Sequence, residues 1–191
     1  MTQVQILAIP GSLRAGSWNA ALLRLAQERA PEGVRVDIWE GLRHVPPFSE
    51  DHEGEAVHEA VEELRSAIAA ADALLVATPE YNGGAPGQLK NALDWASRPY
   101  GLAAVVGKPA GVISASTGSF GGRWAQEDVR KALRLSGAAV LGEGLAVGKA
   151  AERLAELGEA DEEIVAGIDD VLEQLAAKVA EMQRELETSD V

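Results

Sequence analysis

Short apolar runs alternate along the chain with longer segments in which apolar residues recur every three or four positions. The first pattern predicts strands and the second predicts helices. The expected strands are Val4–Ile9, Val34–Trp39, Ala73–Thr78, Ala110–Ala115 and Ala139–Val147. The expected helices are Trp18–Ala30, Ala56–Ala71, Gly87–Ser97, Arg123–Leu135 and Glu162–Leu186. Strands that are separated by helices in this way pair in parallel, with helices on both faces of the sheet.

The second expected strand differs from the others in its polarity. Its apolar positions 34, 36 and 38 alternate with Arg35 and Asp37, whereas a run such as Leu74–Ala77 is apolar on both faces. A strand with one polar face belongs at the edge of a sheet. We therefore expect a doubly wound α/β fold whose five parallel strands have the order 2-1-3-4-5, as in flavodoxin-like proteins. In such sheets ligands bind beyond the carboxyl ends of the strands, where the strand order reverses.

The composition suits one globular domain and narrows the classes of function. The 191 residues are 47% hydrophobic and 25% charged, which favours a folded core. No cysteine is present, so disulfides, thiolate catalysis and cysteine-ligated metals are excluded. A net charge of −13 opposes binding to nucleic acids and anionic membranes, and any phosphate site must be a local exception to it. We expect a cytoplasmic protein, because neither a secretory signal pattern nor a membrane-spanning apolar run is present.

The loop after the first expected strand, Pro10–Asn19, has the composition of a phosphate-binding loop. Because it joins a strand to a helix, backbone N–H groups and the helix dipole converge there. Ser12, Ser17 and Asn19 add hydrogen-bonding side chains, while Arg14 adds a positive charge. A plain tight turn with Ser17 as helix cap is the alternative, but a cap requires neither the arginine nor the second serine. The lysine of a P-loop and the dinucleotide motif are both missing, so a monophosphate is the better ligand.

Two further loops at strand ends are unusual in composition. Residues 78–87, TPEYNGGAPG, combine two prolines that stiffen the loop with glycines that let a flat ligand approach the backbone. An ordinary connection with Tyr81 on the surface is the alternative interpretation. Residues 116–122, STGSFGG, form a third loop that is rich in glycine and serine. A plain flexible connection explains this third loop equally well.

Together the three loops resemble those of the NADPH-dependent FMN reductases, a flavodoxin-like family that includes quinone, chromate and azo-dye reductases. The matching motifs are G-S-x-R-x-x-S-x-N at residues 11–19, P-E-Y-N-G at 79–83, P-G-x-L-K-N-A-x-D-W at 86–95 and S-x-G-x-x-G-G at 116–122. The resemblance extends from the first strand to the fifth. It implies a single FMN-binding domain over residues 1–191, with FMN bound non-covalently and NADPH or NADH as co-substrate.

The resemblance also implies roles for the matching positions. The FMN phosphate would be held by Ser12, Arg14, Ser17 and Asn19. The flavin ring would lie against Pro79, Glu80, Tyr81, Asn82 and Gly83. The third loop, with Ser116, Gly118 and Gly121, would close the other side of the ring. A homodimer or tetramer is implied as well, with the helix around Leu89–Trp95 near the interface.

The reaction implied by the resemblance is transfer of a hydride from the nicotinamide to the flavin and then to a small acceptor, with ping-pong kinetics. Free flavin, quinones, azo dyes and chromate all remain open as acceptors. Because the flavin carries the chemistry, no catalytic side chain is expected. A flavodoxin-type electron carrier without its own NAD(P)H turnover is the main alternative, and an acidic surface would suit it. A regulatory module that binds FMN without turnover is a second alternative.

Two other patterns have simpler explanations than a metal site or a coiled coil. His52 and His58 lie near acidic residues but are six positions apart, whereas helical metal ligands are four apart, so no metal site is expected. The apolar stripe of Glu162–Leu186 has nearly heptad spacing, which would suit oligomerisation. A helix that packs on the sheet accounts for the same stripe more simply.

Overall fold

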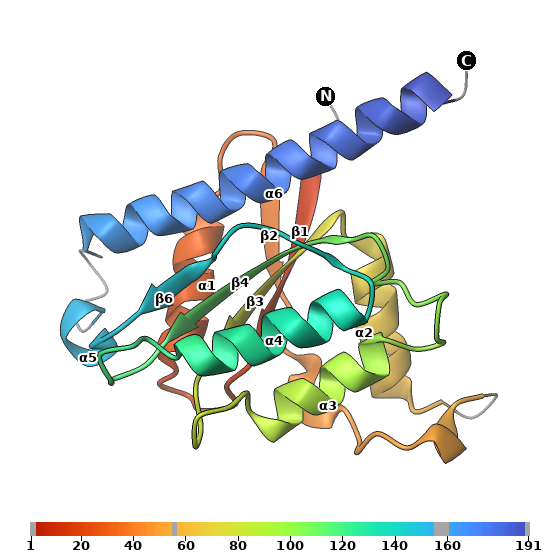
Figure 1. The fold of residues 1–191 in the computed structure, drawn as a ribbon, viewed down its shortest axis with the longest axis horizontal. Helices are drawn as coiled ribbons and strands as arrows, with labels where there is room; N and C mark the ends of the chain where they lie inside the picture. Colours follow the sequence, from red (N-terminus) through yellow and green to blue (C-terminus); the bar gives the residue numbers. More distant parts are fainter. Residues whose placement is uncertain (1–2, 55–56, 155–160, 190–191) are drawn as a thin grey trace.

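The computed structural model describes residues 3–54, 57–154 and 161–189, and these contain the expected parallel sheet (Figure 1). The strands are β1 (Val4–Pro10), β2 (Val34–Ile38), β3 (Ala73–Thr78), β4 (Pro109–Ala115), β5 (Ala139–Val140) and β6 (Leu145–Val147). Their order is β2-β1-β3-β4-β5, with β6 also paired to β4. Every pairing is parallel. The predicted order 2-1-3-4-5 is therefore confirmed, with the half-polar β2 at the edge.

The helices follow the predicted alternation. They are α1 (Trp18–Arg29), α2 (Glu59–Ala70), α3 (Gly87–Ala96), α4 (Arg123–Leu135), α5 (Ala150–Arg153) and α6 (Glu162–Ser189). Two 3-10 turns, η1 (Gly41–His44) and η2 (Glu50–His52), lie between β2 and α2, where the sequence predicted no element. The helix that was expected from Ala56 begins at Glu59, because His58 caps it by accepting a hydrogen bond from the backbone N–H of Ala60 at 3.2 Å. Ala56 itself lies outside the described residues.

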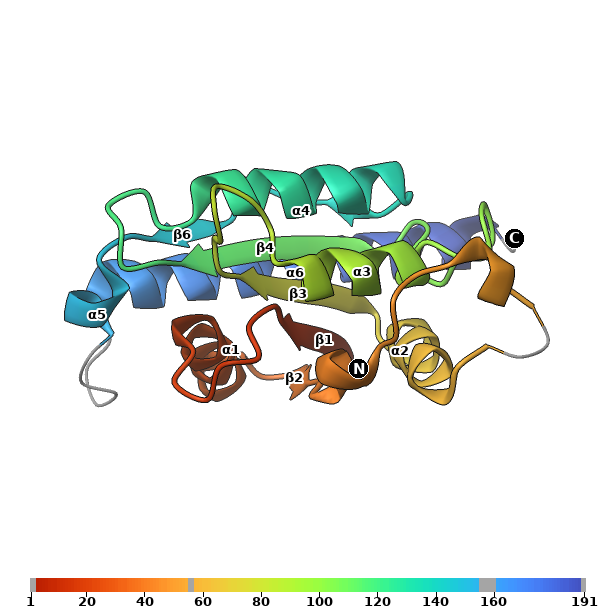
Figure 2. The ribbon, with the colours of Figure 1, turned by 90° about the horizontal axis from the view of Figure 1, so that it is seen from below.

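The helices cover both faces of the sheet, as a doubly wound fold requires. One apolar cluster joins the sheet to α2, α3 and α4 and includes the fully buried Trp95. A second cluster joins the other face to α1 and α6. Figure 2 shows β4 lying between α4 and α1 in successive layers. Helices thus pack on both faces of the sheet, and the loops at the strand ends can form a site.

The expected fifth strand is instead two short strands, β5 and β6, which pair with the start and the end of β4. Gly142 and Gly144, between them, have positive φ angles of 50° and 75°. A side chain at Gly144 would collide with the carbonyl oxygen of Val112. The guanidinium of Arg130 in α4 donates to the carbonyl oxygens of Leu141 and Gly142. The chain leaves the sheet here because glycine permits the turn and α4 binds the freed carbonyl groups.

Helix α6 lies on the sheet, which confirms the simpler explanation of its apolar stripe. Ile164, Ile168 and Leu175 on this stripe are fully buried. The helix is longer than the sheet is wide, and its C-terminal end projects beyond the body of the molecule (Figure 1). Leu186, on that end, is 68% exposed. Among the described residues, no helix combines the length and the apolar character that crossing a membrane requires.

Candidate functional site

The three loops singled out in the sequence meet at one edge of the sheet. They follow β1, β3 and β4, which are adjacent strands, so their carboxyl ends lie side by side. A pocket of about 150 Å³ lies between the loops. It is lined by Ser12, Arg14, Ser17, Trp18, Asn19, Pro79, Glu80, Tyr81, Ala115, Ser116 and Thr117. The tertiary structure thus brings together residues that are up to about a hundred positions apart in the chain.

The first loop offers several backbone hydrogen-bond donors that have no partner in the described part of the protein. Ser17 caps α1, with its Oγ accepting the backbone N–H of Ala20 at 3.2 Å. Within the described residues, the backbone N–H groups of Leu13, Ala15, Gly16 and Ser17 donate to no other group. Free N–H groups at the start of a helix form a ready anion site, because the helix dipole places partial positive charge there. The first loop therefore has the donors and the dipole that an anion such as a phosphate requires.

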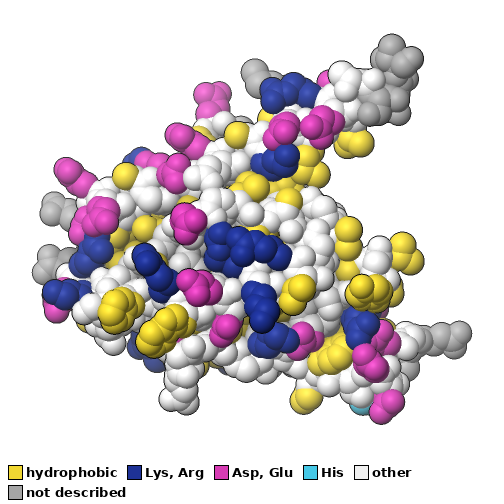
Figure 3. Space-filling model, viewed as in Figure 1, with side chains coloured by type: hydrophobic (Ala, Val, Ile, Leu, Met, Phe, Trp, Pro, Cys, Tyr) yellow, Lys and Arg dark blue, Asp and Glu magenta, His cyan; other side chains and the backbone are white. Residues whose placement is uncertain are grey.

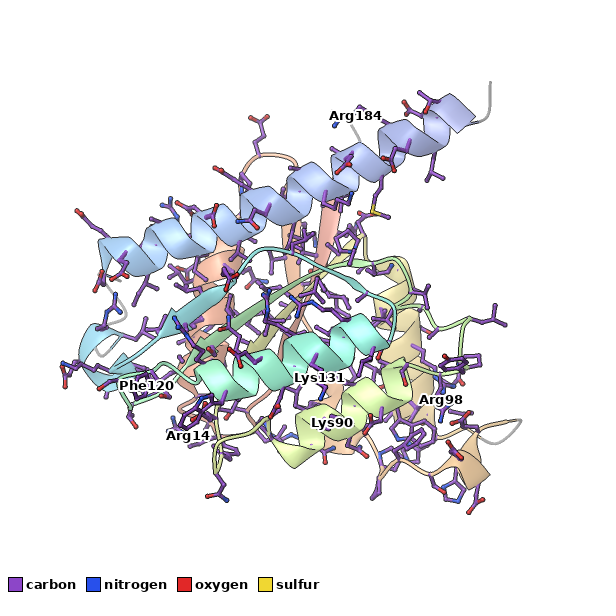
Figure 4. The ribbon with its side chains drawn as sticks, in the orientation of Figure 1. Arg14, Lys90, Arg98, Phe120, Lys131 and Arg184 are labelled. Atoms are coloured by element: carbon purple, nitrogen blue, oxygen red, sulfur yellow. The ribbon has the colours of Figure 1, made fainter. Side chains whose placement is uncertain are left out.

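Arg14 strengthens this anion site, because it forms no ion pair within the described part of the chain. Its guanidinium lies beside Gly16, where an added Cβ would be 3.1 Å from Nη1. In Figure 4, Arg14 and Phe120 lie at the same end of the molecule, although they come from the first and third loops. This end combines an unpaired cation with the free N–H groups, against the overall charge of −13.

Asn19 has a structural task that the sequence did not reveal. Its side chain is 2% exposed. It donates from Nδ2 to the carbonyl oxygen of Ala115 at 3.0 Å and accepts the N–H of Ala115 at Oδ1 at 2.9 Å. This pair of bonds holds the start of α1 to the end of β4, where the strand would otherwise leave both groups unpaired. Asn19 thereby fixes the first loop against the third, and its predicted contact with phosphate stays a prediction.

The second loop contains a tight hairpin turn at its tip. Tyr81 and Gly84 exchange two backbone hydrogen bonds of 3.0 and 3.1 Å. Asn82 and Gly83, between them, have φ angles of 51° and 76°, the pair of positive values that defines a type I′ turn. The Tyr81 hydroxyl lies 3.4 Å from Ser12 Oγ, within hydrogen-bonding distance of the first loop. The turn holds Tyr81 against the pocket while Asn82 and Gly83 do not line it.

The positive φ of this turn explains the glycine at position 83 without any ligand. Contact with a flavin ring would be a second explanation, and mutation can distinguish the two. An added Cβ at Gly83 would lie 3.7 Å from Trp124, an ordinary contact, so the positive φ is the constraint. We expect Gly83→Asn to stay within about 0.5 kcal/mol of wild type, because asparagine tolerates this conformation, while Gly83→Val loses roughly 1–3 kcal/mol. Thermal melting and FMN titration of both variants measure this. A loss of FMN binding in Gly83→Asn without a loss of stability would instead place the flavin against this residue.

Glu80 connects the second loop to the third. Its carboxylate accepts the backbone N–H groups of Trp124 at 3.0 Å and of Ala125 at 3.3 Å, the first turn of α4. Gly122, the residue that precedes this helix, has no side chain with which to cap it. A carboxylate at a helix N-terminus satisfies free donors and the dipole together. Because this partner is more than forty positions away, no local sequence signal could have shown the cap.

The third loop is tied down rather than freely flexible. The N–H of Gly118 donates to Ser116 Oγ at 3.2 Å, and its carbonyl oxygen accepts the N–H of Lys149 at 3.0 Å. A Cβ at Gly121 would come within 2.7 Å of the backbone of Ala146 and Val147, so only glycine fits there. Ser116 lines the pocket, whereas Gly118 and Gly121 shape the loop behind it.

Two aromatic residues beside the pocket were not among the predicted site residues. Phe120 is 76% exposed and Trp124 is 61% exposed. Their rings are stacked, with centroids 6.4 Å apart and planes inclined by 25°. Exposed aromatic rings offer a flat apolar surface on which another flat group can stack. The only signal in the sequence was the position of both residues within or just after the third loop.

Within the described residues there is no cluster of side chains that could hold a metal ion. None of the residues that line the pocket is a histidine, and the chain has no cysteine. The pocket therefore presents donors and a cation for an anion, together with aromatic rings for a flat group.

Comparison with known proteins identifies the family to which this arrangement belongs. Residues 4–152 match the family described as NADPH-dependent FMN reductase. An NAD(P)H-dependent FMN reductase from Pseudomonas aeruginosa is 45% identical over 130 residues, which cover 68% of this chain and 69% of the relative. A quinone reductase from Pseudomonas putida is 44% identical over 134 residues, covering 70% of this chain and 72% of the relative.

The fold agrees with the sequence comparison. The solved structure of the flavoenzyme NAD(P)H:(acceptor) oxidoreductase FerB from Paracoccus denitrificans superposes with a TM-score of 0.80 at 32% identity. The superposition covers 91% of this chain and 98% of FerB. The matched residues include all three loops around the pocket. The chain therefore belongs to the NADPH-dependent FMN reductase family and has the flavodoxin-like fold.

Proposed function

We propose that this protein is an FMN-dependent NAD(P)H oxidoreductase that reduces a small acceptor, with residues 1–191 forming one FMN-binding domain. The pocket formed by the three loops is the observation on which the proposal chiefly rests. It combines N–H groups at a helix start with an arginine, all without a partner among the described residues, in a strongly acidic protein. Quinones and free flavin are the first acceptors to test, since relatives are named for their reduction.

The residues at the pocket suit the phosphate end of FMN in size and chemistry. A volume of about 150 Å³ is smaller than the roughly 300–1,000 Å³ of pockets that enclose a whole drug-sized ligand, but it suits a phosphate and part of the chain attached to it. Ser12, Arg14 and Ser17 would hold the phosphate. The flat ring would rest against Pro79, Glu80 and Tyr81, with Asn82 and Gly83 at the turn and Ser116, Gly118 and Gly121 in the facing loop.

Bound FMN would supply the redox chemistry, which is to take a hydride from the nicotinamide and pass its electrons to the acceptor. The protein would position the flavin and supply the positive charge that holds its phosphate. Backbone N–H groups and the α1 dipole fix the phosphate end, and the stiff second loop supports a flat ring. Tyr81 bounds the pocket and is held by its turn, so it determines which flat molecules can stack there.

We also propose that the protein is a cytoplasmic homodimer or tetramer that uses the outer face of α3. Leu89 and Trp95 of α3 are buried in the core, so a partner would meet the opposite face of this helix. A hollow of about 430 Å³ lies between α3 and α4, beside the strongly exposed Tyr100 and Leu135. Exposed apolar side chains around a hollow favour association. Sedimentation of the purified protein measures the oligomeric state.

Steady-state kinetics test the proposed reaction. We expect the FMN-loaded protein to oxidise NAD(P)H continuously with a benzoquinone as acceptor, and to give the parallel double-reciprocal lines of a ping-pong reaction. Activity should survive EDTA, since we expect no metal to take part. The control is apoprotein without FMN, which should not turn over. Oxidation no faster than that caused by the same concentration of free FMN would favour a flavodoxin-type carrier instead.

A further inference from the structure

Large apolar side chains that are exposed to solvent gather in two parts of the described structure. One group surrounds the hollow between α3 and α4, which we have proposed as an interface between subunits. The other group lies on the three loops and the first turn of α4, and consists of Leu13, Tyr81, Phe120 and Trp124. Figure 3 shows hydrophobic side chains exposed at the N-terminal end of α4. This second group borders the pocket between the loops and needs an explanation of its own.

Phe120 and Trp124, which we call the aromatic pair, form an extended aromatic surface. Their ring planes are inclined by only 25° and their centroids are 6.4 Å apart. Rings at this separation attract one another, and both side chains still leave more than half of their surface open to solvent. A flat conjugated molecule can therefore stack on the pair without separating the two rings.

The backbone beneath the aromatic pair is held in place. The N–H of Trp124 donates to the Glu80 carboxylate at 3.0 Å, and the carbonyl oxygen of Phe120 accepts the N–H of Arg123 at 3.3 Å. Gly121, between the two aromatic residues, packs so closely on β6 that a Cβ there would be 2.7 Å from the backbone of that strand. Because these contacts fix the backbone, a ligand that stacks on the pair does not have to order it first.

The aromatic pair lies beside the tip of the second loop. A Cβ built on Gly83 would be 3.7 Å from the Trp124 ring. Asp128, one turn further along α4, accepts the N–H of Ala85 at 3.3 Å, so the loop and the helix stay together. Neither aromatic residue is among those that line the small pocket proposed for the phosphate. The pair therefore borders the place proposed for the flavin ring and is separate from the place proposed for the phosphate.

Shape rather than charge decides what the aromatic pair can bind. Charged groups of both signs lie next to it, namely Arg123 and the carboxylates of Glu80 and Asp128. A single-ring acceptor that stacks on the flavin would leave the pair uncovered, whereas a second fused ring would extend onto it. A tetrahedral oxyanion such as chromate has no flat face with which to stack. The pair therefore stabilises bound acceptors in proportion to their flat aromatic surface.

We propose that Phe120 and Trp124 determine acceptor specificity, by stacking on the part of a fused-ring acceptor that extends beyond the flavin. Acceptors with two or more fused flat rings, such as naphthoquinones and free flavins, are then favoured over one-ring quinones and over oxyanions such as chromate. The inference rests on the proposed function, since an acceptor is bound for reduction only if the protein is the reductase. It adds no step to the reaction, because the pair affects only how tightly the acceptor is held.

The binding test uses oxidised, FMN-loaded protein without NAD(P)H, so that no turnover occurs. Calorimetric titration compares 2-methyl-1,4-naphthoquinone with 2-methyl-1,4-benzoquinone, which differ by one fused ring. The chain has no cysteine with which these quinones would react. We expect Phe120→Leu and Trp124→Leu each to bind the naphthoquinone about fivefold more weakly, with the affinity for the benzoquinone changed by less than about twofold. Leucine keeps an apolar side chain and every backbone hydrogen bond, so thermal melting should be unchanged.

Two kinds of control accompany this test. Phe120→Tyr and Trp124→Phe keep an aromatic ring and should retain the naphthoquinone affinity to within about twofold. Leu186→Ala removes a similarly exposed apolar side chain from the projecting end of α6 and should behave as wild type. In Figure 4 this end, marked by Arg184, lies far from Phe120. In turnover, the leucine variants should raise the KM for the naphthoquinone about fivefold while the KM for NAD(P)H holds.

Three results would overturn the proposal. They are an unchanged naphthoquinone affinity in both leucine variants, an equal loss for the benzoquinone, and a loss of FMN affinity, which would make the aromatic pair part of the cofactor site. The two proposals can also fail separately. If the leucine variants lose naphthoquinone binding but wild type oxidises no NAD(P)H, the reductase proposal fails and the aromatic pair stands as a binding surface for fused rings. If wild type reduces the naphthoquinone and the leucine variants do so with the same KM, the specificity proposal fails and the reductase stands.

Discussion

Replacing Ser17 with aspartate is expected to weaken FMN binding by about a hundredfold while leaving the fold intact. Ser17 is 3% exposed and caps α1 through its Oγ. Aspartate caps a helix as well as serine does, so the helix keeps its start. Its carboxylate, however, would lie in the loop that we propose to bind the phosphate, and two like charges about 4 Å apart cost on the order of 3–4 kcal/mol near a protein surface. Flavin fluorescence titration measures the affinity, and thermal melting of the apoprotein measures the fold.

Riboflavin separates a phosphate effect from a general loss of the site. It lacks the phosphate, so its affinity for Ser17→Asp should change by less than about threefold, against the roughly hundredfold expected for FMN. Arg14→Ala, which removes the cation without adding an anion, should weaken FMN by about tenfold and spare riboflavin. Equal weakening of both flavins in either variant would show that the phosphate lies elsewhere.

Replacing Asn19 with alanine is expected to destabilise the protein strongly and to weaken FMN and riboflavin alike. The substitution leaves the N–H and the carbonyl group of Ala115 buried without partners, since both are bonded to the Asn19 side chain. Each buried unpaired group costs about 1–3 kcal/mol, so a total loss of roughly 2–5 kcal/mol is expected. In a protein of this size that lowers Tm by roughly 5–15 °C. Both flavins should bind more weakly because the Asn19 side chain no longer holds the first loop to the third.

Asn19→Asp is the matched variant for this test. Its carboxylate still accepts the N–H of Ala115 but offers no donor to the carbonyl group, so an intermediate stability is expected. The outcome that would contradict a positioning role is a variant with normal Tm and normal riboflavin affinity that has lost FMN alone. Asn19 would then be a direct ligand of the phosphate, as the sequence resemblance implies.

The sequence by itself determined the order of the sheet and which three loops meet at its edge. β3 and α4 have the predicted limits, and β2 lies at the edge because its polar positions alternate with apolar ones. The three loops stood out because glycine, proline and short polar residues collect at the ends of apolar strands. These signals are local: each depends on the spacing of residues within about a dozen positions, and the parallel topology then places the strand ends together.

Only the tertiary structure decided how these loops are held. Asn19 forms hydrogen bonds with the end of β4, 96 positions later in the chain. Glu80 caps a helix that begins more than forty positions after it. The split of the fifth strand depends on the Arg130 side chain of α4. None of these contacts leaves a periodic pattern in the sequence. A buried polar side chain forms its hydrogen bond with the unpaired group that packing brings near it. Its partner is therefore fixed only when the helices pack against the sheet.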